Sequence, residues 1–189
     1  MKNRLSLICI SIGLATWGLL MPATAHEQAV ADADDSSGRL DVAEVDVSHD
    51  DRVLETGVVR FVLTFFEPHG FSELAGGYIR MDFDLFRGGK RDRYLMVLAN
   101  PDGGMYGELF SGSGGVIGYS RAWAPSEDQI AIELRMRQLS AGELPSRINW
   151  HASTGYEDES CGEGGDVDGA CVDSTPEYPE RFHRHRLSQ

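Results

Sequence analysis

Short runs in which apolar and polar residues alternate recur along most of this chain. In the clearest run the apolar residues are Ile79, Met81, Phe83 and Leu85, and every residue between them is charged. A period of two is that of a β-strand with one face toward a core and the other toward solvent. Turn-forming residues 87–92 follow, and then a second apolar run, so the stretch Gly77–Leu98 predicts a β-hairpin.

Similar runs, each bounded by residues that favour turns, predict further strands. Arg137–Leu144 is the one segment predicted as a short helix, and Phe71–Leu74 forms at most a helical turn. Outside the hairpin, the predicted strands are Leu40–Val47, Thr56–Phe66, Met105–Phe110, Val116–Ala122, Gln129–Met136 and Arg147–Ser153.

Seven or eight short strands with at most one short helix predict an all-β fold, a sandwich or a barrel. We favour an antiparallel β-sandwich of the jelly-roll or immunoglobulin-like kind. A parallel α/β fold is disfavoured because no βαβ spacing occurs. The sandwich is expected to span residues 40–176. Residues 26–39 are predicted to be a disordered segment and residues 177–189 a flexible tail, since both are poor in apolar side chains.

The first 25 residues have the three parts of a secretory signal peptide. Lys2 and Arg4 precede an apolar run, Leu5–Met21, and Ala23-Thr24-Ala25 follows as a cleavage site. A membrane anchor is the alternative, but serine, threonine and glycine interrupt the run. No later segment reaches the roughly 20 apolar residues of a membrane span. We therefore expect a secreted or periplasmic protein that is not inserted in the membrane after cleavage.

The chain is strongly acidic, with 17 basic and 30 acidic residues and a net charge of −13. Removing Lys2 and Arg4 with the signal peptide would make the exported protein more negative by two charges. Such a charge argues against nucleic acid or an anionic membrane as the main partner. It suits solubility outside the cell, or the binding of a divalent cation.

Cysteine use agrees with export. Cys9 lies in the predicted signal peptide, which leaves Cys161 and Cys171 as a pair. In an oxidising compartment we expect a disulfide between them, and two free thiols are the alternative. The bridge would close a loop rich in glycine and acidic residues, with a stabilisation of about 2–3 kcal/mol in the loop-entropy model.

That loop is also the better of two candidate metal sites. Carboxylates separated by glycines let a loop wrap oxygen ligands around Ca²⁺. The pattern is similar to the calcium loops of small extracellular domains, but the acid follows Cys171 by two positions instead of one. A soluble acidic loop without metal is the alternative. The candidate ligands are Glu163, Asp166, Asp168 and Asp173.

Asp82 and Asp84 form the weaker candidate. They lie on the same side of their predicted strand, with Asp92 across the turn, and make a possible half-site for Ca²⁺. The alternative is an ordinary solvated strand face whose acids are balanced by nearby arginines.

Several of these features follow one another as in a known group of domains. The order is a strand ending in Asp82 and Asp84, a Gln-Ile-Ala-Ile-Glu-Leu strand at 129–134, and a Trp-x-Ala-Ser strand at 150–153. Over residues 40–176 this arrangement resembles secreted DOMON-like or carbohydrate-binding-module-like β-sandwich domains. The resemblance implies a sandwich that binds a sugar, a haem or another surface, or that accompanies an exported enzyme. Haem-binding members use Met and His ligands, the types found at Met81 and His151.

Four aromatic residues, Tyr106, Tyr119, Trp123 and Trp150, are candidates for a sugar-stacking platform if they share an exposed face. Packing in the core or at its rim is the alternative.

No catalytic motif stands out in the sequence. It contains neither His-Glu-x-x-His nor Gly-x-Ser-x-Gly, although the two carboxylates of a glycosidase leave no such motif. The sequence therefore favours an exported, non-catalytic binding or accessory domain with an extracellular glycan or protein as partner, and with structural calcium. The alternatives are a small secreted hydrolase on a jelly-roll scaffold and a cell-surface structural or interaction protein.

Overall fold

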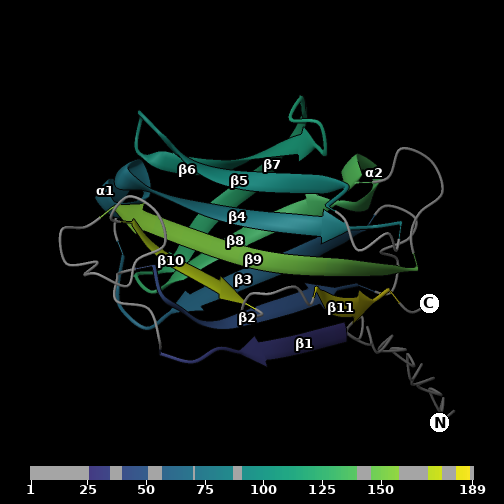
Figure 1. The fold of residues 1–189 in the computed structure, drawn as a ribbon, viewed down its shortest axis with the longest axis horizontal. Coiled ribbons are helices and arrows are strands. Elements are labelled where there is room, and N and C mark those ends of the chain that lie inside the picture. Colours follow the sequence, from purple (N-terminus) through teal and green to yellow (C-terminus); the bar gives the residue numbers. More distant parts are fainter. Residues whose placement is uncertain are drawn as a thin grey trace, which may run out of the picture.

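A computed structural model describes residues 26–34, 40–50, 57–69, 71–86, 91–139, 146–157, 170–175 and 182–187. Within these ranges the chain forms eleven β-strands and two short helices (Figure 1). Every strand pairing is antiparallel, which confirms the predicted all-β antiparallel class. The strands are β1 (His26–Ala31), β2 (Val42–His49), β3 (Val58–Phe65), β4 (Gly77–Asp84), β5 (Arg93–Asn100), β6 (Gly104–Ser111), β7 (Val116–Ser126), β8 (Gln129–Arg135), β9 (Arg147–Glu157), β10 (Ala170–Thr175) and β11 (His183–Arg186).

All the strands belong to one sheet, in the order β1-β2-β3-β8-β7-β6-β5-β4-β9-β10, and β11 also pairs with β9. Helix α1 (Phe71–Gly76) follows β3, and β4 to β8 then form a meander that ends with β8 back beside β3. The sheet curls into a half-barrel, with β4, β5 and β9 in front of β3 and β8 in Figure 1. This differs from the prediction of seven or eight strands in two clearly separate sheets.

The alternating apolar positions form the core inside the curl. Phe61 on β3 contacts Phe83 on β4, with ring centroids 5.8 Å apart, and Trp150 on β9, at 5.9 Å. Burial therefore follows the period of two seen in the sequence, because one face of each strand points into the curl. The largest fully buried side chains are Trp150, Phe61, Phe83, Leu63, Ile79, Met81, Leu95, Leu109, Ile130, Ile132, Leu134 and Met136.

Side chains join the two ends of the curled sheet at a seam between β2 and β10. The backbone N–H of Val42 donates to Asp173 Oδ2 at 2.8 Å, and the hydroxyl of Thr154 on β9 donates to the carbonyl of Leu40 at 2.5 Å. Both hydrogen bonds are buried. They link segments that are more than 100 residues apart in the chain. Buried polar pairs of this kind stabilise the curl because breaking one would leave an unsatisfied group.

Histidines continue the seam between β2 and β11. His49 Nδ1 lies 2.7 Å from His185 Nε2, and His185 Nδ1 lies 3.3 Å from Gln28 Oε1 on β1. One ring must donate and the other accept, so at least one of the two histidines is neutral in this arrangement. His183 packs beside Trp150, and partial burial lowers the pKa of His183 against the opposing effect of the Asp32 carboxylate.

The structure differs from the sequence predictions near both ends of the described chain. Residues 26–31 form β1, where a disordered segment was predicted, because their backbone pairs in register with β2. Residues 183–186 form β11, where a flexible tail was predicted, by pairing with β9. Helix α2 (Met136–Leu139) begins one residue before the predicted helix, and residues 140–145 lie outside the described ranges.

Several predictions cannot be compared with the structure. The predicted signal peptide, Cys161 and the loop acids Glu163, Asp166 and Asp168 lie outside the described residues. Cys171 is opposite Tyr156 in the β9–β10 pairing, but its side chain is not among those described, so the disulfide stays a prediction. No helix in the described ranges has the length and apolar character needed to cross a membrane.

Candidate ligand-binding face

The outer face of β5, β6 and β7, which points away from the core, gathers three of the four predicted stacking residues. Tyr119 and Trp123 alternate along β7 with the buried Ser120 and Ala122, so both point outward. Tyr106 on β6 is opposite Arg121, and its ring centroid lies 6.3 Å from that of Tyr119. Tyr119 is 60% exposed. The strand pairing therefore produces an aromatic surface that solvent can reach.

Trp150 is not part of this surface, and its candidacy as a stacking residue was wrong. Its side chain is 0% exposed. On β9 it alternates with polar residues and shares the inward side with Ile148 and Ala152, which are also buried. The same strand pairs with β4, which places Trp150 opposite Phe83 in the middle of the core. Trp150 is a core residue.

A group of charged side chains surrounds Trp123, and we call Arg60, Arg121, Trp123 and Glu133 the Trp123 cluster. Arg60 Nη2 lies 2.7 Å from Glu133 Oε1, and Arg121 Nη1 lies 3.8 Å from Glu133 Oε2. Both guanidinium groups lie over the indole, with their carbons 5.5 and 4.5 Å from the ring centroid. Cation–π contacts and one shared carboxylate thus hold the two arginines beside the same ring.

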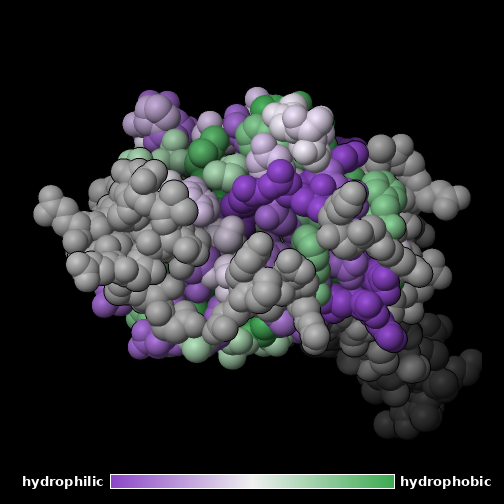
Figure 2. Space-filling model, viewed as in Figure 1, coloured by the Kyte–Doolittle hydropathy of each residue, from purple (hydrophilic) through white to green (hydrophobic). Residues whose placement is uncertain are grey.

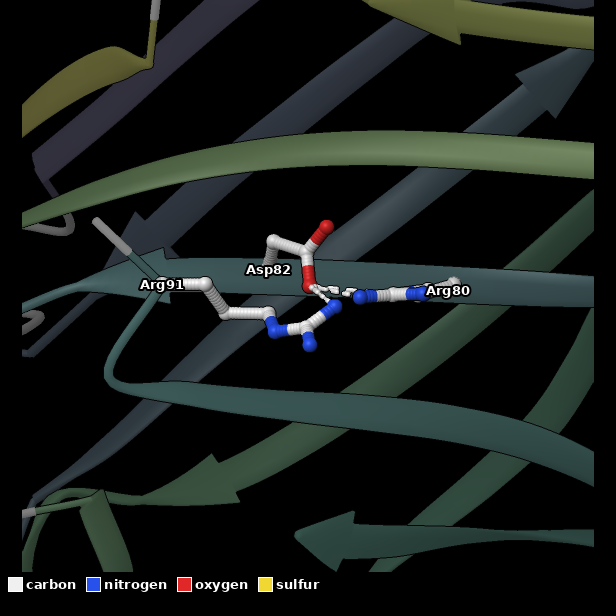
Figure 3. A network of polar contacts seen from close by, with 3 residues as sticks. All are labelled: Arg80, Asp82 and Arg91. Carbon is white, nitrogen blue, oxygen red and sulfur yellow. Dashed lines mark hydrogen bonds and ion pairs between the residues drawn. The ribbon is translucent and has the colours of Figure 1, made fainter. Parts of the chain in front are cut away.

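A second group, again of two arginines, one carboxylate and one aromatic ring, lies on β4, on β5 and just before β5, and we call Arg80, Asp82, Arg91 and Tyr94 the Tyr94 cluster. Arg80 donates to Asp82 Oδ1 from Nη2 at 2.9 Å and from Nε at 3.0 Å. Arg91 Nη1 lies 3.7 Å from the same oxygen (Figure 3). Both guanidinium carbons lie 4.7 Å from the Tyr94 ring centroid. Figure 2 shows hydrophilic residues gathered across the middle of the face that contains β4 and β5.

In the structure, the acidic side chains that suggested a metal half-site at β4 interact with other groups of the protein. Asp82 bonds Arg80, Asp84 is buried beside Asn149, and Asp92 Oδ2 accepts the backbone N–H groups of Leu85 and Phe86. These interactions direct the three carboxylates to different partners. In the part of the chain that the structure describes, no group of three or more potential metal-ligating side chains converges.

Met81 and His151 cannot hold one haem between them. Register places Met81 opposite Ala152 and Asp82 opposite His151, so Met81 and His151 project from opposite faces of the sheet. Met81 is fully buried in the core.

One pair of carboxyl groups went unnoticed in the sequence. Burial raises the pKa of Asp46 on β2, and the negative charge and hydrogen bond of Glu44 raise it further. A glycosidase needs two carboxyl groups that flank the bond to be cleaved from opposite sides. Glu44 and Asp46 instead lie two residues apart on one strand. They therefore do not flank a substrate from opposite sides.

The two arginine–aromatic clusters were also missed in the sequence. Arg80 and Asp82 lie two residues apart on one face of a predicted strand, and this spacing was a usable signal for their ion pair. The remaining members come from different strands, and their meeting depends on the pairing of β3 with β8 and of β4 with β5. Comparison with known proteins adds no guidance, because no protein-family model, curated protein or solved structure gives a significant match.

Proposed function

We propose that this chain is an exported, non-catalytic β domain that binds a glycan on the outer face of β5–β7. The observation that carries the proposal is that Tyr106, Tyr119 and Trp123 share this face. Aromatic rings offer a large, rigid apolar surface at a low cost in side-chain entropy. Sugar rings have apolar faces that stack on such surfaces, and flanking arginines and glutamates bond the hydroxyl groups. The face combines both elements.

The proposal includes the finer points of the sequence analysis. Export rests on the basic, apolar and small-residue pattern of residues 1–25. A jelly-roll or immunoglobulin-like sandwich, as in the DOMON-like or carbohydrate-binding-module-like domains that the sequence resembles, is supported by the packing of Phe61 against Phe83 and Trp150. These contacts bring two parts of the sheet face to face.

Glycan-array screening of the purified mature chain, followed by calorimetric titration of the best binder, tests the proposed function. Tyr119→Ala is expected to weaken binding about 3- to 10-fold, which is the range of one aromatic contact. Phe86→Ala is the matched control, because Phe86 is also exposed but lies at the β4–β5 turn. Its affinity should stay within about 2-fold of the unchanged protein.

Two results would contradict the glycan proposal. Binding to no glycan on the array would favour a structural or interaction protein of the cell surface. Release of reducing sugar from a bound glycan would favour the hydrolase.

Structural calcium is the second part of the proposal and rests on the acidic loop between Cys161 and Cys171. Millimolar Ca²⁺ is expected to raise the melting temperature by a few degrees and EDTA to reverse the change, since a ligand that binds only the native state stabilises it. Differential scanning calorimetry measures the shift, with Mg²⁺ as the control cation. Equal melting in Ca²⁺ and EDTA would remove calcium from the proposal.

A further inference from the structure

We infer that the glycan bound by this face is acidic, and that its carboxylate groups are recognised at the Tyr94 and Trp123 clusters. The inference rests on the proposed function, because it names the class of glycan for the same face. It uses the two arginine–aromatic clusters, of which the stacking argument used only Trp123.

The two clusters repeat one arrangement. Each contains two arginines, one carboxylate and one aromatic ring over which both guanidinium groups lie. In each, one arginine bonds the carboxylate closely, Arg60 to Glu133 at 2.7 Å and Arg80 to Asp82 at 2.9 Å. The second arginine lies beyond hydrogen-bonding distance, Arg121 at 3.8 Å and Arg91 at 3.7 Å.

The second arginine of each cluster is therefore available to a ligand. The Arg121 side chain is 70% exposed and that of Arg91 is 39% exposed. A guanidinium group has five N–H donors in a planar fork that matches a carboxylate. The aromatic ring below each guanidinium orients the fork before the ligand arrives, which lowers the entropy cost of binding.

Charge on the face favours an anion. Each cluster holds two guanidinium groups against one carboxylate, and Glu108 lies between them on β6, opposite Tyr119. The face therefore has a small positive excess on a chain whose net charge is −13. Exposed ion pairs contribute little to stability, so stability alone does not explain why two arginines lie around one carboxylate in both clusters.

The spacing of the clusters fits a polymer with separated negative charges. Tyr94 on β5 and Trp123 on β7 are two strands apart and three alternate positions along the face. Strand geometry then places them roughly 20 Å from each other. Tyr106 and Tyr119 lie between the two clusters. A glycan chain can thus stack on the tyrosines while uronic acid residues reach the arginines on either side.

Nucleic acid fits the face less well. A nucleic acid carries a phosphate on every nucleotide, and most of these charges would meet no cation between the clusters. They would also be repelled by the acidic remainder of the protein. An acidic glycan with carboxylates on only some of its sugars carries fewer negative charges, and both costs are therefore smaller.

The test compares acidic glycans with the same glycans after their carboxyl groups are reduced to alcohols. Calorimetry is run on the mature chain with hyaluronan and partially esterified pectin, and with each reduced counterpart. We expect at least one acidic glycan to bind 10-fold or more tightly than its reduced form. The affinity should fall as salt is raised, because the contacts are between exposed charges.

Arg91→Gln and Arg121→Gln are each expected to weaken binding of the acidic glycan about 10-fold, the size of one lost charge-assisted contact. The reduced glycan should bind these variants about as well as it binds the unchanged protein. Arg137→Gln is the control, because it removes the same charge from an exposed arginine on α2. It should alter the affinity less than 2-fold. Arg91→Lys retains the charge but not the fork, and an intermediate loss is expected.

The other outcomes would overturn either this inference alone or this inference together with the proposed function. Equal binding of acidic and reduced glycans would overturn the inference and leave the glycan-binding function intact. Binding of neither form would overturn both. Tighter binding of single-stranded DNA than of any acidic glycan would show a general polyanion surface and overturn the inference. So would concentration-dependent dimerisation that is lost in Arg91→Gln and Arg121→Gln, since the face would then join two copies of the chain.

Discussion

Trp150→Ala is expected to lower the free energy of unfolding by about 3–5 kcal/mol, the usual cost of truncating a large aromatic side chain in a packed core. Trp150 is fully buried and contacts Phe61 and His183. Because small domains are stable by only about 5–15 kcal/mol, this change alone removes a large part of the total. Urea unfolding followed by circular dichroism measures the loss.

Phe86→Ala provides the control, since that side chain is 63% exposed and should change stability by less than about 0.5 kcal/mol. Trp150→Phe keeps the ring in the core and should lose less than the alanine variant while binding glycan normally. A Trp150→Ala protein of unchanged stability that fails to bind glycan would contradict the structure. It would return Trp150 to the stacking platform.

Asp173→Ala is expected to cost about 1.5–3 kcal/mol, because the change leaves the buried N–H of Val42 without its charged acceptor. The loss should be similar with Ca²⁺ and with EDTA, since the structure uses this carboxylate to join β10 to β2. Thermal unfolding under both conditions gives the comparison. Ser174→Ala, the next residue on β10, is the matched control and should have little effect.

The sequence analysis placed Asp173 among the calcium ligands, and the same experiment tests that role. A loss of stability that appears only in the presence of Ca²⁺ would assign Asp173 to the metal instead of the seam. Equal losses would leave any calcium site to Glu163, Asp166 and Asp168, which lie outside the described residues.

The burial of Trp150 differs from the stacking role that the sequence analysis assigned to it. Trp123 and Trp150 both suggested a sugar-stacking role in the sequence. Their burial differs because β9 lies between β4 and the β10–β11 edge, with Trp150 facing into the curl, whereas Trp123 faces outward on β7. Trp150 alternates with polar residues on its predicted strand, which was a local signal of an inward position, and its stacking role had been assigned from the residue type alone.

The first described residues are a second difference between the structure and the sequence predictions. Residues 26–31 have few apolar side chains, and their composition predicted disorder. They form β1 because β2 offers an unpaired edge whose backbone groups they satisfy. Composition predicts how much apolar surface a segment can bury. It says little about a strand that is held mainly by backbone hydrogen bonds.

The sequence by itself determined the antiparallel all-β class, most strand positions and the inward set of residues on β4. These properties follow from a period of two that is local to each strand. Only the tertiary structure decided that β8 returns to β3, that β4 lies between β5 and β9, and that Asp173 on β10 accepts a backbone N–H of β2 across the seam. Those neighbours are chosen by hydrogen bonds and packing between residues far apart in the chain. The clusters around Tyr94 and Trp123 exist because of that choice.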